Sequence, residues 1–252
     1  MNIRQFTGFC YDEIAKDLNY TRISNFYFKV GEGYFTGFGI SRQGYFNQLK
    51  VMVDIIPLAG EFDIFQSYCN MTDVAYLFFQ DDNRCSYAPP HIGLHFSASF
   101  TQEQYQAMKD TVLEIYETIQ KPLLTYAKDL YSAFSAKMAL DSYRFARAPL
   151  AVRHGFNMDA NYWMFLLETK HYQTAIENFE GYERWYQKEY GHTNERNPNG
   201  IEERLRFFYQ NKQYDEIEKM LDKYRKKNVD LLNQLSKGKI VFPDSIREKY
   251  LR

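Results

Sequence analysis

The sequence FLLETKHYQTAIENFEGY, residues 165–182, decides the expected fold of the second half of the chain, because FFYQNKQYDEIEKMLDKY, residues 207–224, aligns with it at a spacing of 42 residues. In each stretch an apolar run is followed by a polar break, at Lys170 or Lys212, and then by a second run. Within the runs the apolar side chains recur three or four positions apart, which is typical of one face of an α-helix. The pattern predicts a weak repeat in which a helix, a tight polar turn and a second helix form a hairpin.

The match between the two stretches includes their aromatic positions. Phe165 aligns with Phe207, and the tyrosine after the turn is Tyr172 in the first stretch and Tyr214 in the second. We expect this tyrosine to pack back between the two helices. A polar segment, residues 191–200, separates the two hairpins.

This arrangement resembles tetratricopeptide-type hairpins over about residues 162–227. In that family a small or polar residue at the turn precedes a tyrosine and then an alanine, and the likeness here is carried by Tyr172 with Ala175 and by Tyr214. The family period is about 34 residues, its Trp-Leu-Gly pattern is missing here, and Ile217 stands where the small residue would be. A generic pair of αα-hairpins is the alternative. The resemblance implies a protein- or peptide-binding scaffold and assigns no binding residue.

The first half of the chain shows the pattern of one helix followed by a sheet. Residues from about 5 to 18 predict a short amphipathic helix, because Phe6, Phe9 and Ile14 fall on one stripe. Strand patterns then occur at residues 25–30, 34–41, 49–56, 75–80 and 91–98. Gly31-Glu-Gly33 predicts a hairpin turn, and Gly37 with Gly39 predicts a kinked strand. Successive strands joined by short turns favour antiparallel pairing.

After residue 100 the apolar period changes from that of strands to that of helices. Thr101 and Gln104 fit a capping box at the start of a helix. Pro122 should kink or end this helix, and a second helix is expected from about residue 123 to 145. The expected fold class is therefore α+β, with a domain over residues 1–147 (sheet about 25–98, helices about 101–145), a linker and an α-helical hairpin region over residues 159–252.

Composition limits the classes of partner and the compartment. The 31 basic and 32 acidic residues give a net charge of −1, so we expect neither a nucleic-acid partner nor an acidic membrane surface. No apolar run approaches the roughly 18 residues that a membrane span needs, and Asp12 precedes any run of signal-peptide length. Three cysteines without a CxxC motif favour a reducing compartment. We expect a cytoplasmic protein.

Four residues are candidates for chemistry. Asp54 lies within the strand pattern of residues 49–56 and is either a general base or part of the solvent side of that strand. Cys85, His91 and His95 resemble a metal set, but two histidines four apart in a strand are roughly 13 Å apart, too far to share one ion. If a site exists there, Cys85 and His91 belong to it. We otherwise expect no metal and no cofactor.

The function that the sequence favours is a binding or regulatory module whose partner is another protein. Walker, HExxH and GxSxG motifs are missing from the sequence, and Phe and Tyr side chains are available as anchors on a concave helical face. By analogy alone, bacterial immunity and antitoxin proteins have this character. An enzyme with its site on the sheet, near Asp54, Cys85, His91 and His95, is one alternative. A structural homodimer formed through a sheet edge or a hairpin face is another, and the sequence leaves the oligomeric state and the packing of the two halves open.

Overall fold

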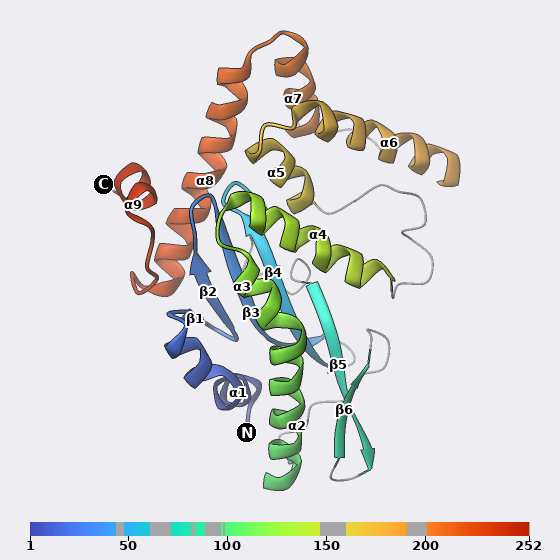
Figure 1. The fold of residues 1–252 in the computed structure, drawn as a ribbon, viewed down its shortest axis with the longest axis vertical. Helices are drawn as coiled ribbons and strands as arrows, with labels where there is room; N and C mark the ends of the chain where they lie inside the picture. The colour runs from blue at the N-terminus through green and yellow to red at the C-terminus, as the bar shows by residue number, and fades with distance from the viewer. Residues whose placement is uncertain are drawn as a thin grey trace.

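The computed structural model describes residues 1–43, 48–60, 72–81, 84–88, 97, 99–146, 160–190 and 201–251. Within these ranges the fold is α+β, as expected (Figure 1). An N-terminal helix precedes a six-stranded sheet in which neighbouring strands are antiparallel and follow the order of the chain, β1-β2-β3-β4-β5-β6. Helices complete the chain and cover the sheet.

The strands and the helices of the first half have the following bounds: α1 (Ile3–Asp17), β1 (Thr21–Ile23), β2 (Phe26–Val30), β3 (Tyr34–Gln43), β4 (Gln48–Pro57), β5 (Thr72–Asp81), β6 (Arg84–Ala88), α2 (Gln102–Ile115), the π-helical turn η1 (Tyr116–Gln120), α3 (Lys121–Tyr126) and α4 (Leu130–Ala146). The remaining helices are α5 (Ala160–Glu168), α6 (Tyr172–Tyr190), α7 (Ile201–Gln210), α8 (Tyr214–Ser236) and α9 (Asp244–Tyr250).

The strands predicted at residues 25–30, 34–41, 49–56 and 75–80 are confirmed as β2 to β5. β2 begins one residue later than predicted, and the other three strands are longer by a few residues. The short strand β1 and the strand β6 were not predicted. Of the strand predicted for residues 91–98, only Ser97 is among the described residues, and it is not in a strand. The rest of that segment, with His91 and His95, lies outside the described residues.

Strands β2 to β4 are buried on both faces of the sheet. Successive side chains of a strand point to opposite sides, so each strand contributes to both faces. On the first face, Tyr27, Phe38 and Val53 pack against helices α1 and α2. On the second face, aromatic and aliphatic side chains of β2 to β4 pack against α8, α9 and the segment between them. The packing of the two halves, which the sequence left open, is thus decided by one sheet that lies between N-terminal and C-terminal helices (Figure 1).

Glycines in β3 allow close packing and leave the strand regular. The ladder with β4 runs without a register shift from Tyr34 to Gln43, so β3 has no bulge at Gly37 or Gly39 against β4. The predicted kink at these glycines stays a prediction. A Cβ atom added at Gly39 would overlap the backbone oxygen of Asn25 and the ring of Phe26. Gly39 therefore allows the neighbouring strand to approach closely. The hairpin turn predicted at Gly31–Gly33 is confirmed by a hydrogen bond of 2.8 Å from the Gly31 N–H to the Tyr34 oxygen.

The helix that begins at Thr101 passes through Pro122 without ending there. Thr101 and Gln104 form the predicted capping box. Before the proline, η1 is π-helical, and the Lys121 N–H bonds to the oxygen of Tyr116, five residues back. This wider turn lets the chain continue as α3 after an extra residue has been inserted. It also directs the buried Gln120 side chain to accept from the Tyr11 hydroxyl at 2.9 Å and to donate to the Met52 oxygen at 2.8 Å.

The single helix expected over residues 123–145 is instead two helices, α3 and α4, and that expectation is wrong. The break lies at residues 127–129. There, Asp129 Oδ1 accepts from the Ser132 N–H at 2.8 Å, and the Ser132 hydroxyl accepts from the N–H of Lys128 and of Asp129, each at 2.9 Å. Side chains of this type satisfy the free N–H groups of a new helix start, which makes the break favourable.

Helices α5 and α6, and α7 and α8, form hairpins where the sequence predicts them. Lys170 and Lys212 both have left-handed backbone, with φ of 64° and 55°. The His171 N–H bonds to the Leu166 oxygen at 2.7 Å, and the Gln213 N–H bonds to the Phe208 oxygen at 2.8 Å. Both turns are therefore Schellman-type ends, closed by a lysine in place of the usual glycine. The likeness to tetratricopeptide hairpins stays a prediction.

The tyrosines after the two turns behave differently. Tyr172 is buried, and its ring stacks on that of Tyr214 with 6.0 Å between centroids. Tyr214 is 44% exposed. The expected packing between helices therefore holds for Tyr172 and only in part for Tyr214.

A polar junction links the end of β4 to the C-terminal helices. The Asn228 side-chain amide of α8, which is buried, donates to the backbone oxygens of Leu58 at 2.8 Å and of Gly60 at 2.7 Å. Glu168 accepts from the Ala59 N–H at 3.2 Å and from Arg225 of α8. These groups are shielded from water. The loss of one of these hydrogen bonds therefore leaves a buried polar group without a partner and lowers the stability of the fold by the desolvation free energy of that group.

We therefore expect Asn228→Ala to lower the free energy of unfolding by about 2–4 kcal/mol, since it leaves two buried carbonyl oxygens without their donor. Urea denaturation followed by circular dichroism measures the change. Gln234→Ala, at an exposed position of the same helix, is the matched control and should change stability by less than about 0.5 kcal/mol. Equal stabilities of the two variants would contradict the role of the junction.

Candidate functional site

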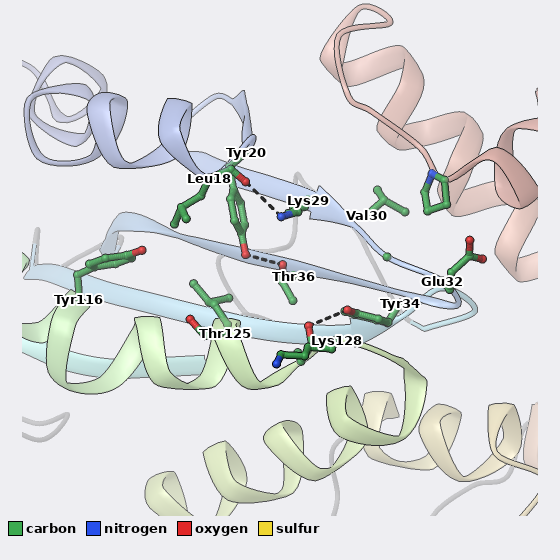
Figure 2. Close-up of a pocket in the computed structure, with 14 residues that line it drawn as sticks. Leu18, Tyr20, Lys29, Val30, Glu32, Tyr34, Thr36, Tyr116, Thr125 and Lys128 are labelled. Carbon is green, nitrogen blue, oxygen red and sulfur yellow. Dashed lines mark hydrogen bonds between the residues drawn. The ribbon is translucent and has the colours of Figure 1, made fainter.

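A cavity of about 510 Å³ lies on the first face of the sheet, where strands and helices that are far apart in the sequence meet (Figure 2). Its walls come from the loop after α1, the β2–β3 hairpin, the segment from η1 through α3 to the start of α4, and Pro243 before α9. The volume is in the range of small-molecule sites in proteins.

Three tyrosines define the shape of the cavity. The Tyr20 and Thr36 hydroxyls share a hydrogen bond of 2.8 Å, and the Tyr34 hydroxyl donates to the Ala127 oxygen at 2.7 Å (Figure 2). The second bond links strand β3 to the α3–α4 break. Tyr116, from η1, lines the opposite end of the cavity, and its hydroxyl makes no hydrogen bond among the described residues. Hydrogen bonds within the protein thus hold the walls of the cavity together.

The hydroxyls of these tyrosines are neutral at physiological pH. Burial raises the pKa of Tyr20 and of Tyr34, and burial together with the nearby Glu117 carboxylate raises the pKa of Tyr116 to about 12. Desolvation disfavours the charged phenolate, which is the cause in each case. The rings therefore offer neutral hydroxyls that donate or accept hydrogen bonds, and they do not supply a base at neutral pH.

Charged side chains lie at the margin of the cavity. The Lys29 ammonium donates to the Leu18 backbone oxygen at 3.2 Å and lies 5.8 Å from the centre of the Tyr20 ring. Lys128 is exposed at the start of the α4 cap. Glu32 accepts a hydrogen bond of 2.5 Å from the Ser245 hydroxyl of α9. Among the described residues neither lysine forms an ion pair with a carboxylate.

Asp54, a candidate from the sequence, lies outside this cavity in a buried ion cluster. Its Oδ1 atom accepts from the Lys137 ammonium at 3.1 Å and from the Ile55 N–H at 2.8 Å. The same ammonium lies 3.2 Å from Oδ1 of Asp141. Asp54 and Lys137 have no exposed side-chain surface, so the solvent-side interpretation of Asp54 is wrong.

Helix α4 is the reason for this burial. It packs against β4 and brings Lys137 to Asp54. A carboxylate removed from water in this way needs a counter-charge, which Lys137 supplies.

Cys85 lies in β6, in surroundings different from those of Asp54. Its thiol is half-buried and lies 3.7 Å from the Ser86 oxygen, and its backbone oxygen accepts from the Thr111 hydroxyl of α2 at 3.2 Å. The structure does not bring Asp54 and Cys85 together. In the part of the chain that is described, no group of three or more His, Cys, Asp or Glu side chains is placed to hold a metal ion.

The sequence reasoning missed the cavity and Lys137. Tyr34 and Thr36 lie on one face of a predicted strand, but the local sequence does not predict the contact of Tyr34 with Ala127. Lys137 has a local signal: it lies among Ala133, Ala136 and Leu140, with Asp141 four residues later. A lysine on such an apolar helix face, with an acid one turn away, predicts a buried pair.

A comparison of the chain with protein-family models, curated proteins and solved structures finds no match. Across the described ranges, no helix combines the length and the apolar character that crossing a bilayer requires.

We expect Lys137→Met to lower the free energy of unfolding by about 3–5 kcal/mol, because the carboxylates of Asp54 and Asp141 would stay buried without the ammonium. Chemical denaturation measures the loss. Lys121→Met, which removes an exposed pair with Glu117, should cost less than about 1 kcal/mol. Adding Asp54→Asn to Lys137→Met should restore part of the stability. A loss no larger than that of Lys121→Met would show that the cluster is not a stabilising ion pair.

Proposed function

We propose that this protein binds a small organic molecule in the cavity between the β2–β3 hairpin and the α3–α4 break. The observation that carries the proposal is a cavity of about 510 Å³ whose tyrosine-lined walls are tied together by hydrogen bonds of the protein. Sites of this size with apolar walls and a few convergent polar groups are typical of ligand binding.

The walls are organised before any ligand arrives. The bond from Tyr34 to Ala127 joins the sheet to the helical side of the cavity, and Tyr20 is held against Thr36. A site that does not have to close or reorder on binding saves the entropy that ordering would cost. The large flat surfaces of the tyrosines favour ring-shaped ligands, which pack edge-to-face or offset against them.

The lining residues favour binding over catalysis. The described lining contains no histidine, cysteine or serine, and its only carboxylate, Glu32, is held by Ser245. Its tyrosines are neutral, because burial raises their pKa. Nucleophilic catalysis needs a nucleophile beside a base, and no such pair occurs in this lining.

A protein partner, expected from the sequence, is a second proposal that a different observation supports. Phe207 of α7 and Tyr214 of α8 are 56% and 44% exposed. They lie on either side of the turn at Lys212, and the ring of Phe207 contacts that of Phe208 with 5.8 Å between centroids. Exposed rings of this kind are the side chains that most often anchor a protein interface.

The cavity proposal predicts that a neutral ring compound, N-phenylnaphthylamine, binds with a rise in its fluorescence. Thr125→Trp places a large side chain at an exposed position that lines the cavity. It should weaken binding about tenfold or more, a loss of about 1.4 kcal/mol. Thr174→Trp, exposed on α6, is the matched control and should bind like the unchanged protein. Failure of the dye to bind, or equal binding by both variants, would overturn the proposal.

The partner proposal predicts that the protein, used as bait in an extract of its host, retains a specific protein that the double variant Phe207→Ser, Tyr214→Ser loses. Removing two exposed rings should weaken an interface by about 2 kcal/mol or more if they are its anchors. The retained protein is then purified and its affinity for both forms is measured by calorimetry. Equal affinities would rule out this surface.

A further inference from the structure

The cavity has a polar end and an aromatic end. In Figure 2, Tyr116 lies at one end, and Tyr34, Lys128 and Glu32 lie toward the other. Tyr20 and Thr125 are between them, with the Tyr20 hydroxyl engaged by Thr36. The cavity therefore presents ring faces along one part of its length and charged groups along another, which is the arrangement that an amphipathic ligand requires.

The two lysines of the cavity lining supply hydrogen-bond donors for a ligand. Lys29 and Lys128 each carry three N–H donors and no acceptor. In the described part of the chain, Lys29 donates one hydrogen bond, to the Leu18 oxygen, and the Lys128 ammonium has no partner. The hydroxyls of Tyr116 and Thr125 also line the cavity, and they can donate or accept hydrogen bonds. A ligand group that accepts hydrogen bonds would satisfy the lysine donors.

The carboxylates near the cavity are turned to other groups. Glu32 accepts from the Ser245 hydroxyl, and Asp129 accepts from the Ser132 N–H at the start of α4. This hydrogen bond lowers the pKa of Asp129, so the group is charged at neutral pH. Glu117 accepts from Lys121 on the outer side of the helix. Their charges balance the lysines at long range, so an anion would be recognised by direct contact with the ammonium groups.

We infer that the ligand is an amphipathic anion, with an apolar ring body against Tyr116 and Leu124 and a carboxylate, sulfonate or phosphate group near Lys128 and Lys29. This inference rests on the proposed binding function and adds the chemical class of the ligand. Charge-assisted hydrogen bonds from an ammonium to such a group are stronger than neutral ones. The ring faces of Tyr116 and Tyr20 supply apolar contact for the body.

Two dyes with the same rings test the inference. Anilinonaphthalenesulfonate carries an anionic sulfonate, and N-phenylnaphthylamine is its neutral counterpart. Dissociation constants are measured by fluorescence on the whole chain, for the unchanged protein and for Lys128→Gln, Lys29→Gln and Lys227→Gln. Lys227 is exposed on α8 and serves as the matched control. Thr125→Trp identifies the cavity as the binding site for each dye.

The anionic dye should bind more tightly than the neutral dye, and rising salt should weaken only the anionic one. Lys128→Gln should weaken the anionic dye about two- to fivefold, the range for an exposed ion pair, and leave the neutral dye within about twofold. Lys29→Gln should act in the same direction, and Lys227→Gln should change neither dye. Circular dichroism confirms that each variant is folded.

The outcomes separate this inference from the proposed function. If both dyes bind in the cavity with equal affinity, or if Lys128→Gln weakens both equally, the anion is excluded and the cavity proposal stands. If neither dye binds, or if Thr125→Trp leaves both unaffected, the cavity proposal fails and the anionic ligand fails with it.

Discussion

Burial of the sheet on both faces is the constraint on which the rest of the structure depends. Rings and branched side chains alternate along β2, β3 and β4, so neither face can be left in water. Helices α1 and α2 cover the first face, and α8 with α9 covers the second (Figure 1). Burial of this kind is the main favourable term in folding. Because the second face must be covered, the C-terminal helices α8 and α9 pack against strands from the first quarter of the chain.

This return of the chain explains where the cavity lies. Residues of the β2–β3 hairpin and of the α3–α4 break line the cavity together with Pro243. Tyr34 spans it by reaching the Ala127 oxygen. Hydrogen bonds of the protein across the cavity therefore hold its shape.

Polar groups within the packed layers specify how the layers meet. Asn228 of α8 binds the turn after β4, Arg225 of α8 binds Glu168 of α5, and Lys137 of α4 binds Asp54 of β4. Apolar contacts alone tolerate small shifts between layers, whereas a buried polar group has few positions in which it is satisfied. Such groups hold the helices of the second half in one arrangement on the sheet.

The sequence by itself determined the α+β class, four of the strands, the capping box at Thr101 and the two helical turns at Lys170 and Lys212, because each depends on neighbouring residues and on the period of apolar side chains. Only the tertiary structure decided the burial of Asp54 and the cavity between Tyr20, Tyr34 and Tyr116. Lys137 is 83 residues from Asp54, and Ala127 is 93 residues from Tyr34. Contacts between residues so far apart in the sequence follow from the packing of whole layers, and a local sequence pattern does not predict them.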